Sequence, residues 1–293
     1  MSAARPKLSP QQVCFVVDDV SAAVQRCEKE FAWGPFYQFT APVENAVYKD
    51  WAGKKLVEVA LGMAGNVQVE FIHVFEGHDA VEAYQAEYKR GFQHLGIQCH
   101  SREAAVDYLT ALGAKVDELN EFPGIRFAFV DVPTGSAMFE LLQQTKDWGK
   151  EDALDVDTKA SDPIEGFFQI DRATIVTDDI ETALVFYAQA FGWDDATYTT
   201  STLHYDGKQN LFKRFIGHAG TLDIELLQPL EMAGDPYSLH LNRGSHGLVH
   251  AGGLSKGITD SIEAAVEYQW LESKEKFSLS NWLAGSSSLQ MRY

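Results

Sequence analysis

The sequence has few of the features that mark secreted or membrane-spanning proteins. Three of its 293 residues are cysteines, Cys14, Cys27 and Cys99, and they form no CxxC motif. Structural disulfides are therefore not expected, and a reducing compartment fits the composition best. The chain has no run of about 18 apolar residues that could cross a bilayer, and residues 1–12 lack the apolar stretch of a secretory signal. We expect a cytoplasmic protein.

Basic residues are also scarce. The chain has 24 Lys and Arg against 42 Asp and Glu, which gives a formal net charge of -18. Binding to nucleic-acid phosphates or to anionic lipid is driven by concentrated Lys and Arg. This composition therefore predicts neither a nucleic-acid partner nor a membrane surface as a partner.

A single pattern recurs along the chain: an apolar strand, an acidic or polar capping residue, then an Ala-rich helix. Its copies begin at QVCFVVDDVSAAVQ (12–25), HLGIQCHSREAAVDYL (94–109), RATIVTDDIETALVFY (172–187) and HAGGLSKGITDSIEAAVEY (250–268). In the first copy Asp18 or Asp19 can cap the helix. The runs VYKDWAG, LVEVALG and VQVEFIHVF follow and predict strands. Each copy is therefore predicted to be a βαβββ module.

The modules predict an α+β fold with two domains. We predict an N-terminal domain over 1–145 with the first two modules, an acidic linker over 146–165, and a C-terminal domain over 166–293 with the last two, of which the final one is shortened. Within each domain the modules are expected to pair into a half-barrel, cup-shaped sheet. An alternative is that the first module pairs with the fourth and the second with the third. That pairing would bring polar residues of the two halves of the chain into one cup.

Four polar residues stand where the concave face of such a cup should be apolar. They are Gln12, Glu70, His94 and Glu140, and VEF and FEL surround the two glutamates. Buried carboxylates are costly without a partner. Two carboxylates, an imidazole and an amide oxygen form a ligand set typical of a divalent metal. Such a metal would stabilise an enediolate formed when a proton is removed next to a carbonyl, with a glutamate as the base.

These segments resemble the vicinal oxygen chelate superfamily, which includes glyoxalase I, methylmalonyl-CoA epimerase, extradiol dioxygenases and bleomycin-resistance proteins. The resemblance runs from about residue 10 to residue 270 and is strongest in GFQHLGIQCHSREAAVDYL and in the strands VQVEFI and MFELL. It implies metal ligands on the first and last strands of paired modules, at Gln12, Glu70, His94 and Glu140. Their order matches animal-type glyoxalase I, whereas the GPF segment and EYKRGFQHLGIQ resemble the epimerase-like branch.

The resemblance implies a metal-dependent lyase or isomerase that acts on a small-molecule substrate. Glu140 or Glu70 would be the catalytic base, no organic cofactor is implied, and Zn, Ni, Co, Mn and Mg all suit the ligands. The protein is expected to be a monomer or a homodimer. A non-catalytic, bleomycin-resistance-like binding protein is an alternative, and an extradiol-type dioxygenase is a second one.

The second half carries different residues at the four equivalent positions: Arg172, Glu225, His250 and Gln290. A guanidinium stays protonated and cannot bind a cation, so this half is expected to be degenerate. Extradiol dioxygenases use His, His and Glu in their second half, which argues against that activity. The second base typical of epimerases is not assigned, although Lys54 or Lys55 lies near its place. Cys14 and Cys99 are interpreted as small core residues, because free cysteines are usually buried.

Overall fold

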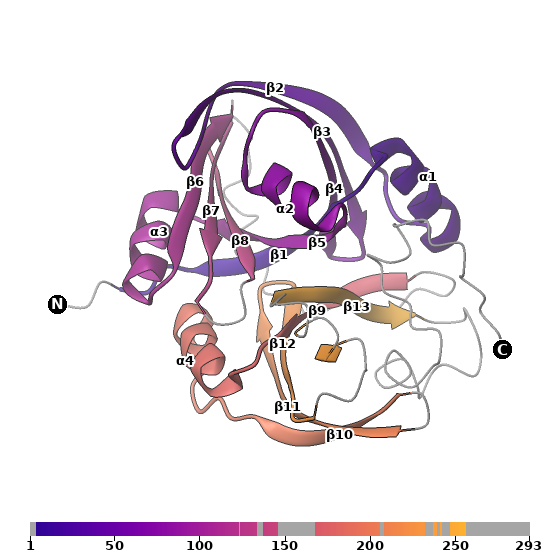
Figure 1. Cartoon of the computed structure of the whole chain (residues 1–293), viewed down its shortest axis with the longest axis vertical. Coiled ribbons are helices and arrows are strands. Elements are labelled where there is room, and N and C mark those ends of the chain that lie inside the picture. The colour runs from indigo at the N-terminus through magenta and orange to yellow at the C-terminus, as the bar shows by residue number, and fades with distance from the viewer. Residues whose placement is uncertain are drawn as a thin grey trace.

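The computed structural model describes residues 4–122, 124–133, 137–145, 168–205, 208–231, 237–238, 241 and 247–255. They form a closed barrel, followed by a curved sheet that lies against one side of the barrel (Figure 1). Mixed sheets with few helices make this an α+β fold, as the sequence predicts. None of the described helices is long and apolar enough to cross a membrane.

The barrel contains the strands of the first two predicted modules. Its elements along the chain are β1 (Leu8–Val16), α1 (Val20–Phe31), β2 (Tyr37–Tyr48), β3 (Trp51–Ala64), β4 (Val67–Glu76), α2 (Ala80–Tyr88), β5 (Gly91–Cys99), α3 (Arg102–Ala111), β6 (Lys115–Phe122), β7 (Ile125–Asp131) and β8 (Met138–Gln144). The strand order around the barrel is β1-β4-β3-β2-β6-β7-β8-β5. The sheet is therefore closed rather than an open half-barrel, because β2 meets β6 at Tyr48 and Glu118 and β1 pairs with β5.

The second sheet contains the third module and the start of the fourth. Its elements are β9 (Phe168–Val176), α4 (Ile180–Phe191), β10 (Thr199–Tyr205), β11 (Lys208–Ala219), β12 (Leu222–Pro229) and β13 (Gly247–Ser255), in the order β10-β11-β12-β9-β13. The predicted linker and the helix of the fourth module lie outside the described residues, so the domain boundaries stay a prediction.

The predicted helix caps explain where the helices begin. The side chain of Asp19 accepts a hydrogen bond from the backbone N–H of Ala22 at 2.8 Å, and Ser101 accepts one from Ala104 at 3.1 Å. These bonds satisfy N–H groups that have no partner within the helix. Asp19 rather than Asp18 is thus the cap of α1.

Alternate residues of β1 belong to two separate cores. Val13 and Phe15 pack with α1 and with the second sheet on the outer face of the barrel, whereas Cys14 and Val16 lie in the cluster that fills its interior. This is the alternation expected of a strand buried on both faces. The outer face of β1 is also tied to the second sheet, because Thr221 N donates to Pro10 O at 2.9 Å. The strand that carries Gln12 and Cys14 is therefore covered on both sides.

The hairpin between β2 and β3 turns earlier than the sequence pattern suggests. The run VYKDWAG reads as one strand, but the chain reverses at Lys49 and Asp50, so that Gly53 lies within β3. Lys49 has a φ of 50°, which is the left-handed conformation that tight two-residue hairpins need. A lysine gives no local signal for that conformation.

Helix α2 was not predicted from the apolar pattern. Figure 1 shows it inside the ring of barrel strands, and its buried residues Ala80 and Val81 belong to the interior cluster. Asp79 caps it by accepting a hydrogen bond from the backbone N–H of Glu82 at 2.6 Å. An acidic cap followed three residues later by a glutamate is a known helix-start pattern. That pattern was the available signal for α2.

Candidate metal centre

The candidate ligands lie on four adjacent barrel strands, β4, β1, β5 and β8. In one row across the interior face, Cys14 pairs with Glu70 on one side and with His94 on the other. In the next row Gln12 pairs with Gly96, and Gly96 pairs with Glu140. Residues two apart on a strand share a face. The rows therefore present their side chains to the same interior.

The register also shows how the two modules correspond. Gln12 lies two residues before Cys14, which is the partner of Glu70. In the same way, His94 lies two residues before Gly96, which is the partner of Glu140. The four residues thus occupy equivalent places in two copies of one module. By the same register the counterpart of Cys14 is Gly96, which has no side chain.

The imidazole of His94 lies between the two carboxylates. Its Nε2 atom is 3.2 Å from Glu70 Oε2 and 3.3 Å from Glu140 Oε2. All three residues are less than a tenth exposed, and His94 is 1% exposed. The structure therefore brings three of the four predicted ligands together at one buried point.

Gln12 lies in the same interior with its carbonyl oxygen available. Its Nε2 donates a hydrogen bond to Gln68 Oε1 at 2.8 Å, while its Oε1 has no hydrogen-bond partner. The side chain lies directly against Gly96, where an added Cβ would be 2.1 Å from Gln12 Oε1. Gly96 thus leaves the space that this amide occupies.

A neighbouring amide orients the imidazole. Nδ1 of His94 is hydrogen-bonded to Oε1 of Gln93, which lies at the β-bulge between β1 and β5. Bulges commonly redirect a side chain next to a functional site. Because the oxygen of Gln93 accepts a hydrogen bond from Nδ1–H, a neutral His94 directs the lone pair of Nε2 toward the two carboxylates.

The charges of the cluster depend on one another. Burial alone would lower the pKa of His94, but the nearby carboxylates of Glu140 and Glu70 outweigh it and raise that pKa to about 9. Burial raises the pKa of Glu140, and His94 partly offsets the rise. In the absence of a cation, an imidazolium therefore supplies positive charge beside the two carboxylates.

Three buried oxygen and nitrogen atoms in this cluster make no well-formed hydrogen bond: Gln12 Oε1, Glu70 Oε2 and His94 Nε2, of which the last two face each other at 3.2 Å. Each such atom costs about 1 to 3 kcal/mol when it is left unsatisfied. A carbonyl oxygen, a carboxylate oxygen and an imidazole nitrogen are all metal-binding atoms. The residues present therefore fit a divalent cation.

Cys14 also belongs to this cluster, which the sequence argument missed. Its sulfur, a carboxylate oxygen of Glu70 and a ring nitrogen of His94 all lie within 4.8 Å of one another. Burial raises the pKa of the Cys14 thiol, and Glu70 and Glu140 raise it further. The available signal was its position two residues after Gln12, which puts both side chains on one face of a strand.

The structure also distinguishes the two lysines near the expected second base. Lys54 is exposed and pairs with Glu44. Lys55 points into the barrel, where its Nζ lies 2.7 Å from Asp79 Oδ2 and 2.9 Å from Glu118 Oε1. Burial acts to lower the pKa of Lys55, but the two carboxylates outweigh it and raise the pKa. Lys55 is thus a protonated group that joins β3, α2 and β6.

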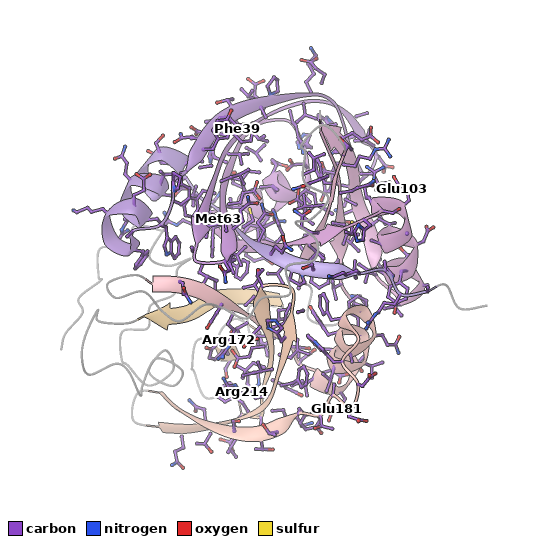
Figure 2. All side chains as sticks on the ribbon, turned by 180° about the vertical axis from the view of Figure 1, so that it is seen from behind. Phe39, Met63, Glu103, Arg172, Glu181 and Arg214 are labelled. Atoms are coloured by element: carbon purple, nitrogen blue, oxygen red, sulfur yellow. The ribbon has the colours of Figure 1, made fainter. Side chains whose placement is uncertain are left out.

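The second sheet places an arginine where the barrel has its cluster. Thr174 on β9 pairs with Glu225 on β12, just as Cys14 on β1 pairs with Glu70 on β4 in the barrel. Arg214 Nε donates to one oxygen of Glu225, and Thr174 donates to the other at 2.6 Å. Figure 2 shows Arg172 and Arg214 on this sheet. The side chain of His250 and the whole of Gln290 lie outside the described residues.

Residues 10–129 match the glyoxalase/bleomycin resistance protein/dioxygenase superfamily. This part of the chain belongs to that superfamily. The match covers the strands that carry Gln12, Glu70 and His94, and it confirms the resemblance given by the sequence motifs. Members of the superfamily are usually enzymes, and many bind a divalent metal.

Solved structures extend the likeness to most of the chain. A variant of 4-hydroxymandelate synthase from Streptomyces coelicolor is 13% identical, with a TM-score of 0.55 over 90% of this chain and 76% of that one. Methylmalonyl-CoA epimerase from Mycobacterium tuberculosis is 15% identical, with a TM-score of 0.37 over 50% of this chain and 95% of that one. No curated protein matches the sequence. At 13% identity, the likeness to 4-hydroxymandelate synthase shows a similar fold.

Proposed function

We propose that this superfamily member is a metal-dependent enzyme that moves a proton next to a carbonyl or thioester group. The outcome would be that of a glyoxalase-like lyase or of an epimerase or isomerase. The supporting observation is the buried group of oxygen and nitrogen atoms on Gln12, Glu70 and His94 that make no well-formed hydrogen bond, with Glu140 beside His94. These four residues would hold the metal.

A bound divalent metal supplies a Lewis acid that stabilises negative charge on substrate oxygens. The chain supplies the other elements of the reaction. Gln93 holds the Nδ1 proton of His94, so that Nε2 is the metal-binding nitrogen. Burial in the barrel excludes bulk water, which strengthens every charge interaction at the cluster.

The proton transfer is assigned to the glutamates. A carboxylate removes the proton from the carbon next to the carbonyl, and the electron pair of the C–H bond moves toward the carbonyl oxygen. The proton then returns to the same carbon or to its neighbour. Glu140 is the favoured base, because its raised pKa brings it closer to neutral pH. Glu70 reaches the cluster from β4 rather than β8, so it is placed to act from another side.

The residues of the cluster favour this chemistry over ring-cleaving oxygenation. Non-haem iron oxygenases typically bind iron through two histidines and one carboxylate. The described residues at this site provide one histidine, His94, and two glutamates. A dioxygenase would consume oxygen with a catechol and would need Fe or Mn, so an oxygen electrode tests this alternative directly.

Elemental analysis of the purified protein tests the proposal first. We expect stoichiometric divalent metal in the wild-type protein and its loss in His94→Ala. His78→Ala, a change at an exposed histidine of the same barrel, should keep the metal. Protein without metal that still binds a small molecule in the barrel would instead support the sequestering function of bleomycin-resistance proteins.

Solvent deuterium exchange then tests the reaction. We expect deuterium to enter the carbon next to the carbonyl of candidate thioesters or 2-oxo compounds. Glu140→Gln should abolish the exchange. Glu58→Gln is a matched control, because Glu58 is a partly exposed glutamate on β3 that bonds Gln38 rather than the cluster. Full exchange by the Glu140 variant and none by Glu70→Gln would reassign the base to Glu70.

A further inference from the structure

Cys14 is the buried donor that the proposed function leaves unused. It lies on β1 with Glu70 as its register partner on β4 and His94 as its partner on β5. Its side chain is fully buried, at 0% exposure. The sulfur is therefore enclosed between two predicted ligands.

The spacing of these donors suits a single cation. The sulfur, a Glu70 oxygen and a His94 nitrogen lie within 4.8 Å of one another. Zinc binds sulfur at about 2.3 Å and nitrogen or oxygen at about 2.0 to 2.2 Å, so two ligands of one ion are at most about 4.5 Å apart. The observed spacing of up to 4.8 Å is close to that limit.

Two further observations point to a ligand at this place. Glu70 Oε2 and His94 Nε2, beside Cys14, are buried 3.2 Å apart and make no well-formed hydrogen bond. The module repeat also puts Gly96 at the position that corresponds to Cys14. The first module therefore has a sulfur atom at a position where the second module has no side chain.

We propose that Cys14 is a sulfur ligand of the metal, so that the site prefers Zn²⁺ or Co²⁺ to Mg²⁺ or Mn²⁺. This inference rests on the proposed metal site. Thiolates are soft ligands that favour the first pair of ions, whereas oxygen ligands suit the second pair. When the cation binds, the S–H proton passes to solvent and the sulfur electron pair is donated to the metal, with no change of oxidation state.

The Co²⁺-loaded protein provides a readout that does not depend on activity. We expect a near-ultraviolet sulfur-to-cobalt charge-transfer band in the wild-type protein. Cys14→Ser should lose that band and keep the weaker visible bands, because Glu70, His94 and Glu140 still bind cobalt. We also expect Cys14→Ser to lower the Zn²⁺ affinity by at least roughly tenfold, or about 1.4 kcal/mol, with a smaller change for Mg²⁺.

The other cysteines provide matched controls. Cys99→Ser changes a buried thiol at the C-terminal end of β5, which donates to Leu142 O on β8, and it should keep the band. Cys27→Ser/Cys99→Ser leaves Cys14 as the one cysteine of the chain, and it should keep the band as well. This double variant tests the inference even where Cys14→Ser fails to fold.

The outcomes separate the two proposals. Stoichiometric cobalt without a charge-transfer band in the wild-type protein would overturn the role of Cys14 and leave the metal site standing. A wild-type protein that binds no cobalt, zinc or magnesium would overturn both. A band that survives Cys14→Ser with full intensity would assign the sulfur to another cysteine.

Discussion

Lys55 Nζ lies 2.7 Å from Asp79 Oδ2 inside the barrel, at 4% and 1% side-chain exposure. The pair links β3 to the residue that caps α2. Glu118 on β6 completes the group, since its second oxygen accepts a hydrogen bond from the backbone N–H of Ala80 at 3.2 Å. The helix inside the barrel is therefore held at its N-terminal end by buried charges.

Removal of Lys55 should destabilise the protein strongly. Lys55→Met leaves two buried carboxylates without their cation, and breaking a buried ion pair in this way costs about 3 to 5 kcal/mol. Chemical denaturation monitored by circular dichroism measures the free energy of unfolding.

The adjacent lysine is the control for this experiment. Lys54 pairs with Glu44 at 75% and 59% exposure, and exposed pairs contribute about 0 to 1 kcal/mol. Lys54→Met should therefore have little effect. Equal losses in the two variants would contradict the buried network.

Metal uptake should weaken as the pH falls. His94 binds a metal in its neutral form, and its pKa in the metal-free protein is about 9. Below that pH the cation must displace this proton, which alone lowers its apparent affinity by about tenfold for each pH unit, and release of the Cys14 thiol proton would add to the fall. Calorimetric titrations at pH 7 in buffers of different ionisation enthalpy should show proton release, and an affinity that is constant from pH 6 to pH 9 would contradict the assignment.

The metal-free protein should show the opposite dependence in its stability. The folded pKa of His94 is raised from 6.5 to about 9, so the native state binds the proton more tightly than the unfolded chain does. Its contribution is complete below pH 6.5 and is lost as the pH rises through about 9. Denaturation with a chelator present at pH 6 and at pH 9.5 measures it, and His94→Gln should flatten the difference.

Gly96→Ala should disturb the metal site through Gln12. The new methyl group would lie 2.1 Å from Gln12 Oε1 and 2.6 Å from its Cβ, so the amide must leave its place. Overpacking of this kind costs about 1 to 3 kcal/mol, and we expect weaker metal binding in addition.

Gly62→Ala separates these two effects. A Cβ at Gly62 would meet the ring of Phe36 at 2.4 Å, away from the cluster. It should destabilise the barrel without changing the metal affinity. Weakened metal binding in both variants would mean that the effect of Gly96→Ala is general.

Replacement of Arg214 should leave the metal content unchanged. Its guanidinium bonds Glu225 in a buried part of the second sheet, at 10% and 6% exposure. Arg214→Gln should therefore lower stability by about 3 kcal/mol or more, while elemental analysis finds the wild-type amount of metal. A loss of metal would place a ligand in the second sheet.

The repeats made much of the fold predictable from the sequence. The strands around Glu70, His94 and Glu140 were found because charged residues interrupt apolar alternation, and the caps Ser101 and Asp19 mark helix starts. The turn at Lys49 and the helix α2 were missed, since the turn has a lysine at its left-handed position and the helix has a weak apolar pattern.

The sequence predicted the main residues of the candidate site, but it did not predict all of them. Glu70, His94 and Glu140 stand out in sequence because their chemistry differs from that of their neighbours. Cys14 and Lys55 do not, because a cysteine in an apolar strand reads as core and the sequence does not distinguish Lys55 from its neighbour Lys54. Their roles depend on strand register across the barrel, which places Cys14 beside His94.

The barrel is not equally strong around its circumference. Within the described residues, β2 and β6 pair at Tyr48 and Glu118 alone, whereas β1 and β5 pair along their full lengths. All the proposed ligands are on the well-paired side, on β4, β1, β5 and β8. A separation of β2 from β6 would thus leave the mutual spacing of the donor atoms unchanged, and the β6 residue at that seam, Glu118, also holds Lys55 and α2.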